Sequence, residues 1–287
     1  MNRFFTTLAT SLLVIGSVFG SFAQEANSLL WKVSGKDIRK PSYIFGTIHM
    51  LPEDKYFFTD KMQAALTSSD VLALEVDMDV PLAEQMKIAG EMIMPDGKTW
   101  ADYMTADEYA LVKSAFVDSL GFKEKKVDKY SKIKPIYVSG LILSELLGKV
   151  KMYEKELTSL AKKEKKTIIG LETFQEQMEI VGSIPLEDQI QDLKTTTASM
   201  VRDYNEMLDA YVSQNLAELE KVTKNDEGFD KMEAKLLTER NDRWIKAIQE
   251  KLASTPTFYA VGAMHLVGEK GLLEQLKAAG YSVEAVN

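Results

Sequence analysis

The chain carries one short motif near each end, and this repetition restricts its possible folds more than any other feature. Gly46-Thr47-Ile48-His49 follows an apolar run near the amino end, and Gly262-Ala263-Met264-His265 follows another near the carboxyl end. These are the two histidines of the 287-residue chain. Imidazole titrates near neutrality and is the commonest metal ligand, so the paired motifs predict one functional site. The alternative is that two histidines lie near turns by coincidence.

Each motif lies in a predicted βαβ unit, in which a strand, a helix and a second strand follow one another. In the first unit, apolar runs lie at 28–33, 42–48 and 71–76, and a helical spacing lies at 60–67. In the second unit, an apolar run at 257–261 is followed by a helical stretch at 269–279 and by a turn and strand at 280–286. Runs 28–33 and 42–48 predict a hairpin. Two such units predict an α/β fold with a mixed, mostly parallel central sheet built from two related halves.

The sequence between the two units is mostly helical in pattern and predicts a large helical insertion at about 81–255. A short apolar run near 167–171 predicts one strand within it. Thr105 and Glu108 form a capping-box pattern at the start of a helix over 106–120. Because no linker rich in Pro, Gly or Ser divides the chain, residues 24–287 are expected to form a single domain.

The amino end and the composition indicate an exported protein. Residues 1–23 have the basic start, short apolar core and small-residue exit of a secretory signal peptide, so we expect a periplasmic or secreted protein without a transmembrane anchor after cleavage. A net charge of −8 argues against nucleic acid as a partner. The chain has no Cys, so any metal must be held by His, carboxylate or carbonyl groups.

Four side chains with catalytic or metal-binding chemistry are expected at the carboxyl ends of predicted strands. They are His49, Glu75, Glu172 and His265. Ligands of open α/β sheets bind at this edge, so groups from distant positions in the chain are expected to meet there. Two alternatives remain: Glu75 as a solvated acid at a strand end, and Glu172 as an acid favoured by the start of a helix.

This set of side chains fits two kinds of hydrolytic chemistry. Two imidazoles with one or two carboxylates match a divalent transition metal such as Mn, Co, Fe or Zn. An open coordination position would activate water, with a spare carboxylate as general base. Without a metal, a His/Glu pair would activate water. Arg240 and Arg243 share a helix face, where they would clamp a substrate carboxylate or oxyanion or pair with acids of the protein.

Taken together, these motifs resemble those of the TraB/GumN family, which is related to the Tiki proteases and more remotely to the erythromycin esterases and the ChaN-type haem-binding lipoproteins. The resemblance covers nearly the whole chain after the signal peptide. It is carried by segments 30–33, 43–49, 74–75, 170–173, 240–241 and 258–268.

The resemblance implies an α/β fold of two related halves, with a catalytic centre made by the paired Gly-x-x-His motifs. His49, His265 and Glu75 match family positions directly, Arg240-Asn241 matches the family's Arg-Asn pair, and Glu172 matches a recurrent position. Tiki members are described as Mn- or Co-dependent metalloproteases. Such a resemblance predicts the fold more safely than it predicts the substrate.

Three hypotheses for function follow. The leading one is an exported metal-dependent hydrolase of peptide or small-molecule substrates, with a peptidase favoured. Here His49, Glu75 and His265 hold or surround the metal, and Arg240 and Asn241 bind the substrate or its oxyanion. The second is a metal-independent ester or lactone hydrolase in which His49 and Glu75 activate water. The third is a periplasmic haem- or metal-binding protein without activity. The sequence indicates no oligomeric state.

Overall fold

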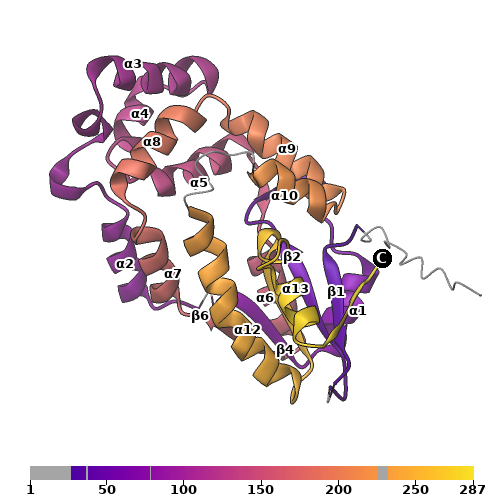
Figure 1. Cartoon of the computed structure of the whole chain (residues 1–287). Coiled ribbons are helices and arrows are strands. Elements are labelled where there is room, and N and C mark those ends of the chain that lie inside the picture. The colour runs from indigo at the N-terminus through magenta and orange to yellow at the C-terminus, as the bar shows by residue number, and fades with distance from the viewer. Residues whose placement is uncertain (1–26, 37, 78, 225–231) are drawn as a thin grey trace, which may run out of the picture.

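A six-stranded sheet forms the centre of the protein (Figure 1). The computed structural model describes the chain apart from residues 1–26, 37, 78 and 225–231, so the predicted signal peptide lies outside the described residues. The strand order is β6-β4-β7-β2-β1-β8. The strands are β1 (Leu30–Ser34), β2 (Ser42–Thr47), β4 (Val71–Val76), β6 (Thr167–Glu172), β7 (Thr257–Gly262) and β8 (Ser282–Ala285).

Strands β6, β4, β7 and β2 run parallel to one another, and β1 pairs antiparallel with both β2 and β8. The predicted hairpin is β1 and β2, and the α/β fold with a mixed, mostly parallel sheet is confirmed. Every residue of β4 is buried, as expected for a continuous apolar run in a parallel strand that is covered on both faces. Strand β7 lies between β4 and β2, so the two ends of the chain meet in the middle of the sheet.

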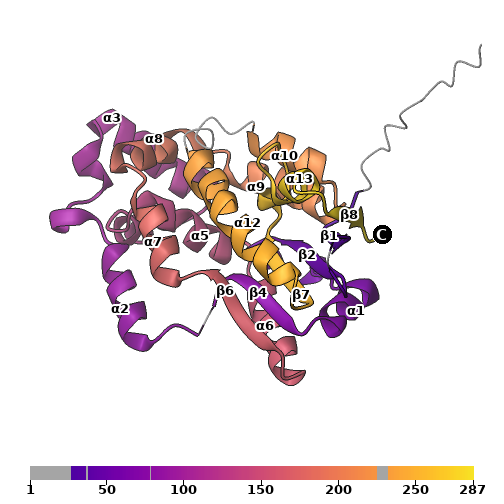
Figure 2. The same ribbon diagram turned by 60° about the horizontal axis from the view of Figure 1, so that its bottom comes forward.

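Helices cover both faces of the sheet (Figure 2). Helices α1 (Asp60–Ser68) and α6 (Tyr153–Lys163) lie on one face, and α12 (Glu239–Leu252) and α13 (Leu272–Ala278) lie on the other. Each presents one apolar stripe to the strands. In α12 the buried side chains recur at helical spacing, at Trp244, Ile245, Ile248 and Leu252.

The predicted insertion is largely helical and has a second hydrophobic cluster of its own, around Trp100 and Phe116. Its main helices are α2 (Leu82–Glu91), α3 (Ala106–Ser114), α4 (Glu124–Tyr130), α5 (Pro135–Leu146), α7 (Phe174–Gly182), α8 (Leu186–Thr196), α9 (Met200–Val212) and α10 (Leu216–Lys224). Helix α3 begins with the predicted capping box, in which Thr105 and Glu108 exchange hydrogen bonds.

Two predicted helices differ from the observed ones. The apolar pattern over 186–212 predicts one continuous helix, but the structure has two, α8 and α9, separated by a turn at 197–199 in which Thr197 Oγ1 donates to the Leu193 carbonyl. The last helix, α13, begins at Leu272 and not at Glu269, since Gly268 has φ of 80° and forms a turn.

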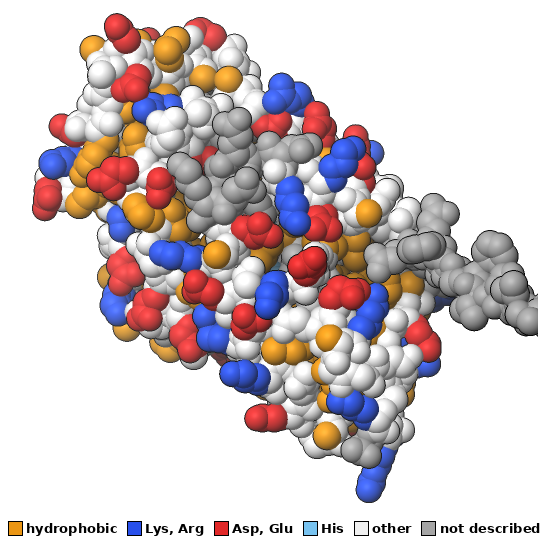
Figure 3. Space-filling view, viewed as in Figure 1, with side chains coloured by type: hydrophobic (Ala, Val, Ile, Leu, Met, Phe, Trp, Pro, Cys, Tyr) orange, Lys and Arg blue, Asp and Glu red, His pale blue; other side chains and the backbone are white. Residues whose placement is uncertain are grey.

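Charged side chains of both signs are interspersed over the face shown in Figure 3. Apolar side chains lie between them in small groups on this face. Within the described part of the chain, no helix combines the length and the apolar character that crossing a membrane requires.

Candidate active site

A cavity of about 400 Å³ opens at the carboxyl edge of the parallel strands. Four of the predicted site residues line it, and their remaining neighbours in the wall are mostly apolar. The four are His49, Glu75, Arg240 and His265. They come from segments after β2, in β4, in α12 and after β7, so the edge of the sheet brings together residues that are up to 216 positions apart in the chain.

Strand pairing places the two Gly-x-x-His motifs side by side. In the parallel register of β2 and β7, Gly46 lies opposite Val261, and Thr47 lies opposite Gly262. A Cβ at Gly46 would stand 3.0 Å from the Ala263 side chain, so only glycine lets the second motif approach this closely. A Cβ at Gly262 would stand 3.2 Å from Oε1 of Glu75. The glycines therefore allow close contact between the motifs and the carboxylate.

The two histidines occupy very different environments although their motifs are alike. After β7, the chain forms a single 3-10 turn over Ala263–His265, which leaves His265 only 3% exposed. After β2, the chain instead continues toward the short strand β3 (Leu51–Pro52), and the His49 side chain is 75% exposed. The duplicated motif has thus produced one buried and one accessible imidazole.

Glu75 lies near the end of β4 and is nearly buried among polar groups. Its Oε1 accepts a hydrogen bond from the Gly262 amide at 2.6 Å, and its Oε2 accepts one from Arg240 Nη2 at 2.6 Å. Burial opposes ionisation of Glu75, but the charges of His265, Arg240 and His49 outweigh this effect and lower its pKa to about 2. Because His265 is itself neutral at pH 7, Arg240 is the main cation that keeps Glu75 ionised there, with a smaller contribution from His49.

Arg240 joins two carboxylates at the centre of the site. Its Nη2 donates to Oε1 of Glu172 at 2.7 Å as well as to Glu75, and its Nε donates to the same Glu172 oxygen at 3.0 Å. Arg243 donates to the other Glu172 oxygen at 3.1 Å. The predicted cationic clamp therefore binds a carboxylate of the protein. Gln177 Nε2 also lies 3.3 Å from each of the two acids.

The tautomer of His265 is determined by Asn241. The Asn241 amide nitrogen donates to the carbonyl oxygens of His265 and Lys270, so its Oδ1 is an acceptor and receives the His265 Nδ1 proton at 2.7 Å. The Nε2 atom of His265 consequently carries the lone pair and accepts from Arg240 Nη1 at 3.1 Å. Burial lowers the pKa of His265 to about 3, so the ring is neutral near pH 7.

His49 has an acidic neighbour on a distant helix. Its Nδ1 lies 3.7 Å from Oε1 of Glu154, in the first turn of α6. The Glu154 carboxylate raises the pKa of His49 above its ordinary value. The second carboxylate oxygen of Glu154 is buried and has no hydrogen-bond partner among the described residues. The two imidazoles of the site are therefore shifted in opposite directions, His49 toward the charged form and His265 toward the neutral one.

The structure does not place all the predicted site residues in the cavity wall. Glu172 and Asn241 lie behind it, where Glu172 binds Arg240 and Asn241 binds His265. Sequence reasoning missed Glu154 and Gln177. Glu154 stands at no strand end and in no motif, and its only signal was its place in the first turn of an amphipathic helix. Gln177 lies in α7, one helical turn after Thr173, which caps this helix and directly follows Glu172.

Metal-ligand chemistry is present at the site, although the ligands are not gathered around one point. The described residues contain no assembled group of three or more His, Cys, Asp or Glu side chains that would hold a metal ion. His265 Nε2 and Glu75 Oε1 are 3.7 Å apart, which suits two ligands of one cation. Arg240 contacts both residues and supplies a positive charge at the same place.

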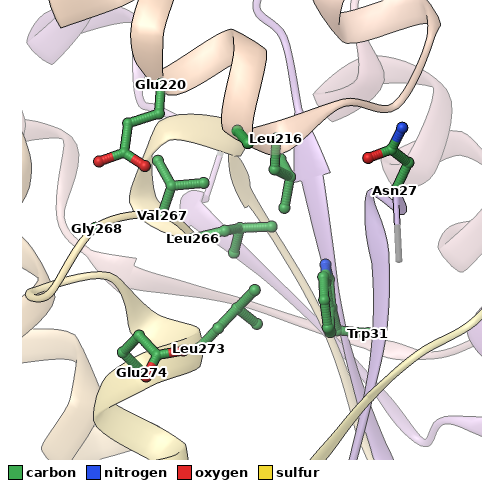
Figure 4. Close-up of a pocket in the computed structure, with 10 residues that line it drawn as sticks. Asn27, Trp31, Leu216, Glu220, Leu266, Val267, Gly268, Leu273 and Glu274 are labelled. Atoms are coloured by element: carbon green, nitrogen blue, oxygen red, sulfur yellow. The ribbon is translucent and has the colours of Figure 1, made fainter. Parts of the chain in front are cut away.

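A second, smaller cavity lies on the far side of the second motif, between α10, the start of α13 and β1 (Figure 4). Its volume is about 90 Å³, and Trp31, Leu216, Leu266 and Leu273 form its apolar walls. Its polar members include Glu220 and Glu274 but no histidine or arginine. We therefore assign the candidate active site to the cavity that is lined by His49, Glu75, Arg240 and His265.

Comparison with known proteins agrees with the motifs. A sequence model of the TraB/PrgY/gumN family matches residues 29–285. The chain belongs to this family. No solved structure matches it.

Curated relatives of this family member are named metalloproteases. They are human Metalloprotease TIKI1, with 22% identity over 91% of this chain and 62% of the relative, Metalloprotease TIKI1 of Xenopus tropicalis, with 21% over 90% and 61%, and Metalloprotease TIKI2 of Danio rerio, with 22% over 91% and 61%. The chain thus spans about three-fifths of the length of these relatives. The predicted resemblance to the TraB/GumN family is confirmed.

Proposed function

We propose that this member of the TraB/PrgY/gumN family is an exported, metal-dependent hydrolase of peptide substrates. The single observation that carries the proposal is the pairing of a buried, neutral imidazole with an ionised carboxylate in the wall of a cavity, His265 Nε2 with Glu75 Oε1 at 3.7 Å. Perturbed titratable groups of this kind concentrate at catalytic sites. The relatives are named metalloproteases, which supports hydrolysis of peptides as the class of reaction.

The donor set fits a divalent cation. His265 offers the Nε2 lone pair because Asn241 holds the Nδ1 proton, which is the usual support of a metal-binding histidine. His49 lines the same cavity and would be a second imidazole ligand once its ring is deprotonated, with Glu75 beside the bound water. The chemistry that such a cation supplies when bound is Lewis-acid activation of a carbonyl group and of water.

The residues of the chain have separable roles in this proposal. Glu75 accepts the proton of the attacking water, for which its ionised form is required. Arg240 keeps Glu75 ionised and places a positive charge beside the developing oxyanion. The proton that Glu75 accepts would then pass to the leaving amine, so that the carboxylate is regenerated. Asn241 and Glu172 act behind the wall, where they orient His265 and Arg240, so we assign Asn241 to positioning and not to substrate binding.

A metal-independent hydrolase is the second candidate, and Arg240 favours it. The guanidinium already supplies a fixed cation in contact with Glu75 and with His265 Nε2. A divalent cation would have to share Glu75 with it, and like charges at this distance repel. In this version His49 and Glu75 activate water, and Arg240 stabilises the oxyanion.

One experiment separates these candidates. Protein purified without a histidine tag is analysed for bound metal, and hydrolysis of a peptide library is measured before chelation, after chelation and after restoration of Mn. Loss and recovery of cleavage support the metal-dependent hydrolase, and cleavage that resists chelation supports the second candidate. Bound metal without any cleavage indicates a binding protein and contradicts the proposal. The His265→Ala variant must lose the activity, and cleavage that survives this substitution refutes the site.

A further inference from the structure

Gly140 stands in the middle of α5, where neither the backbone nor a neighbour requires a glycine. The helix runs over Pro135–Leu146, and Gly140 is not among the residues with positive φ. A Cβ built at Gly140 meets no heavy atom of the described residues within 4 Å. Glycine destabilises a helix interior relative to alanine. Its presence here therefore carries a cost in stability without a local structural reason.

The free space at Gly140 belongs to the cavity of the candidate active site. Gly140 and Leu143, which lie on the same side of α5, both line this cavity together with His49 and His265. The other side of α5 is buried in the helical cluster through Val138 and Ile142. A side chain at position 140 would consequently extend into the cavity and not into the protein core.

The wall near α5 is apolar, whereas the charged groups are confined to the sheet edge. Apolar and aromatic side chains from three further segments surround the space. They are Tyr204, Met207, Tyr211, Leu219, Leu236 and Leu237. Two of the tyrosine hydroxyl groups are engaged, Tyr204 with the Met50 carbonyl and Tyr211 with the Gly46 carbonyl. The apolar faces of these rings therefore remain for a ligand.

From this arrangement we infer that the substrate has a bulky, uncharged apolar group beside the bond that is cleaved, and that Gly140 determines how large this group can be. The inference rests on the proposed hydrolase function and specifies its substrate class. A charged group would lose water in this space without gaining a partner, since Arg240 is already paired with Glu75 and Glu172. An aromatic or branched aliphatic group would gain from burial against Leu, Met and Tyr.

The binding part of the inference is tested without hydrolysis. The probe is N-phenylnaphthylamine, an uncharged dye whose fluorescence rises in apolar surroundings, titrated into the full chain. Gly140→Leu should weaken its binding on the order of tenfold or more, because the new side chain fills the space that the dye uses. Gly90→Leu is the matched control, since Gly90 lies on α2 with equally open space outside the cavity.

Melting temperatures show that the variants are folded. Gly140→Ala should raise the melting temperature because alanine is the better helix former, and Gly140→Leu should not lower it. Unchanged dye binding by Gly140→Leu, or an equal loss in Gly90→Leu, overturns the inference. A drop in melting temperature for Gly140→Ala overturns it as well, because Gly140 would then have a structural role.

Hydrolysis of a peptide library by the same variants separates this inference from the proposed function. Gly140→Leu should shift the preferred side chain next to the cleaved bond from large to small apolar residues, whereas Gly90→Leu should leave the preference unchanged. If His265→Ala abolishes cleavage but Gly140→Leu alters no preference, the hydrolase proposal stands and this inference fails. If the dye results hold but no peptide is cleaved, the apolar pocket stands and the hydrolase proposal fails.

Discussion

The guanidinium of Arg240 lies 2.6 Å from the carboxylate of Glu75, and both side chains are about nine-tenths withdrawn from solvent. Removing the cation would take from Glu75 its bonded guanidinium and would leave the buried Glu172 with the partly exposed Arg243 as its remaining cation among the described residues. Arg240→Met is therefore expected to lower the free energy of unfolding by about 3–5 kcal/mol, measured by urea denaturation. Arg243→Met is the control. The Arg243 side chain is 46% exposed, so its loss should cost about 1 kcal/mol or less. Equal losses for the two variants would contradict the central role of Arg240.

The free energy of unfolding should decrease as the pH is lowered, mainly because His265 takes up a proton when the protein unfolds. The folded-state pKa of His265 is lowered from 6.5 to about 3, so its contribution is fully present above pH 6.5 and is lost as the pH falls toward 3. Between pH 6.5 and 4.5 the free energy of unfolding should decrease by about 1 kcal/mol per pH unit on account of this one group. Glu75, with its pKa lowered from 4.5 to about 2, adds a second loss below pH 4.5.

Denaturation of His265→Asn between pH 7 and 4.5 checks this prediction. The variant has no titrating ring at position 265, so its stability should vary less with pH across this window. His49 does not obscure the result, because its raised pKa places its stability change above pH 6.5, with stability lost as the pH rises. A slope that is the same in the variant and the original chain would show that His265 is not buried in its neutral form.

The chain's two histidines make the site directly visible by NMR. In protein without a tag, long-range ¹H–¹⁵N spectra should show one neutral ring with its proton on Nδ1, from His265, and one ring near pH 7 that is shifted toward the protonated form, from His49. Asn241→Ala should remove the preference for the Nδ1 tautomer. It should also lower kcat/KM for the cleaved peptide by about 10- to 100-fold, the usual effect of losing such a supporting residue.

The Asn241→Asp variant tests the same position by adding a negative charge beside His265. It keeps an oxygen acceptor for the His265 Nδ1 proton and adds a negative charge, so the Nδ1 tautomer should persist and the pKa of His265 should rise. The same spectra recorded between pH 4 and 8 measure both quantities. If Asn241→Ala leaves the tautomer unchanged, the hydrogen bond between Asn241 and His265 does not determine it.

The close approach of the two motifs predicts a specific steric cost. Gly46→Ala would place a methyl group 3.0 Å from both Ala263 Cβ and Leu266 Cδ1, so the free energy of unfolding should fall by about 1–3 kcal/mol. Gly90→Ala is the comparison because no atom lies within 4 Å of its new methyl group. It should be neutral or stabilising by up to about 1 kcal/mol. Thermal unfolding followed by circular dichroism distinguishes the two, and equal stability would rule out the close packing of the motifs.

The sheet was largely predictable from the sequence because its signals are local. The apolar run of β4 and the strands before each motif predict parallel strands, and parallel strands place their carboxyl ends together. The burial of His265 and the exposure of His49 were not predictable. They depend on whether the chain forms a 3-10 turn after the strand. The β-branched Thr47-Ile48 favours extended backbone and Ala263-Met264 favours helical backbone, but such propensities are too weak to decide a single turn.

The contact between His49 and Glu154 was not predictable from the sequence for a different reason. Glu154 is 105 positions away and reaches His49 only because β3 pairs with β5 (Val150–Lys151), which sets the start of α6 beside the first motif. Two-residue strands leave almost no pattern in a sequence. Likewise, the break between α8 and α9 follows a side-chain contact that spacing does not reveal.

Strand β7 begins 181 positions after the last residue of β4, yet it occupies the space between β4 and β2. During synthesis, a ribosome must therefore translate the whole intervening segment before those two earlier strands acquire their common neighbour. Nascent chains that stop short of β7 have neither a continuous sheet nor His265. Competence of the site thus depends on the synthesis of β7 and of the motif that follows it.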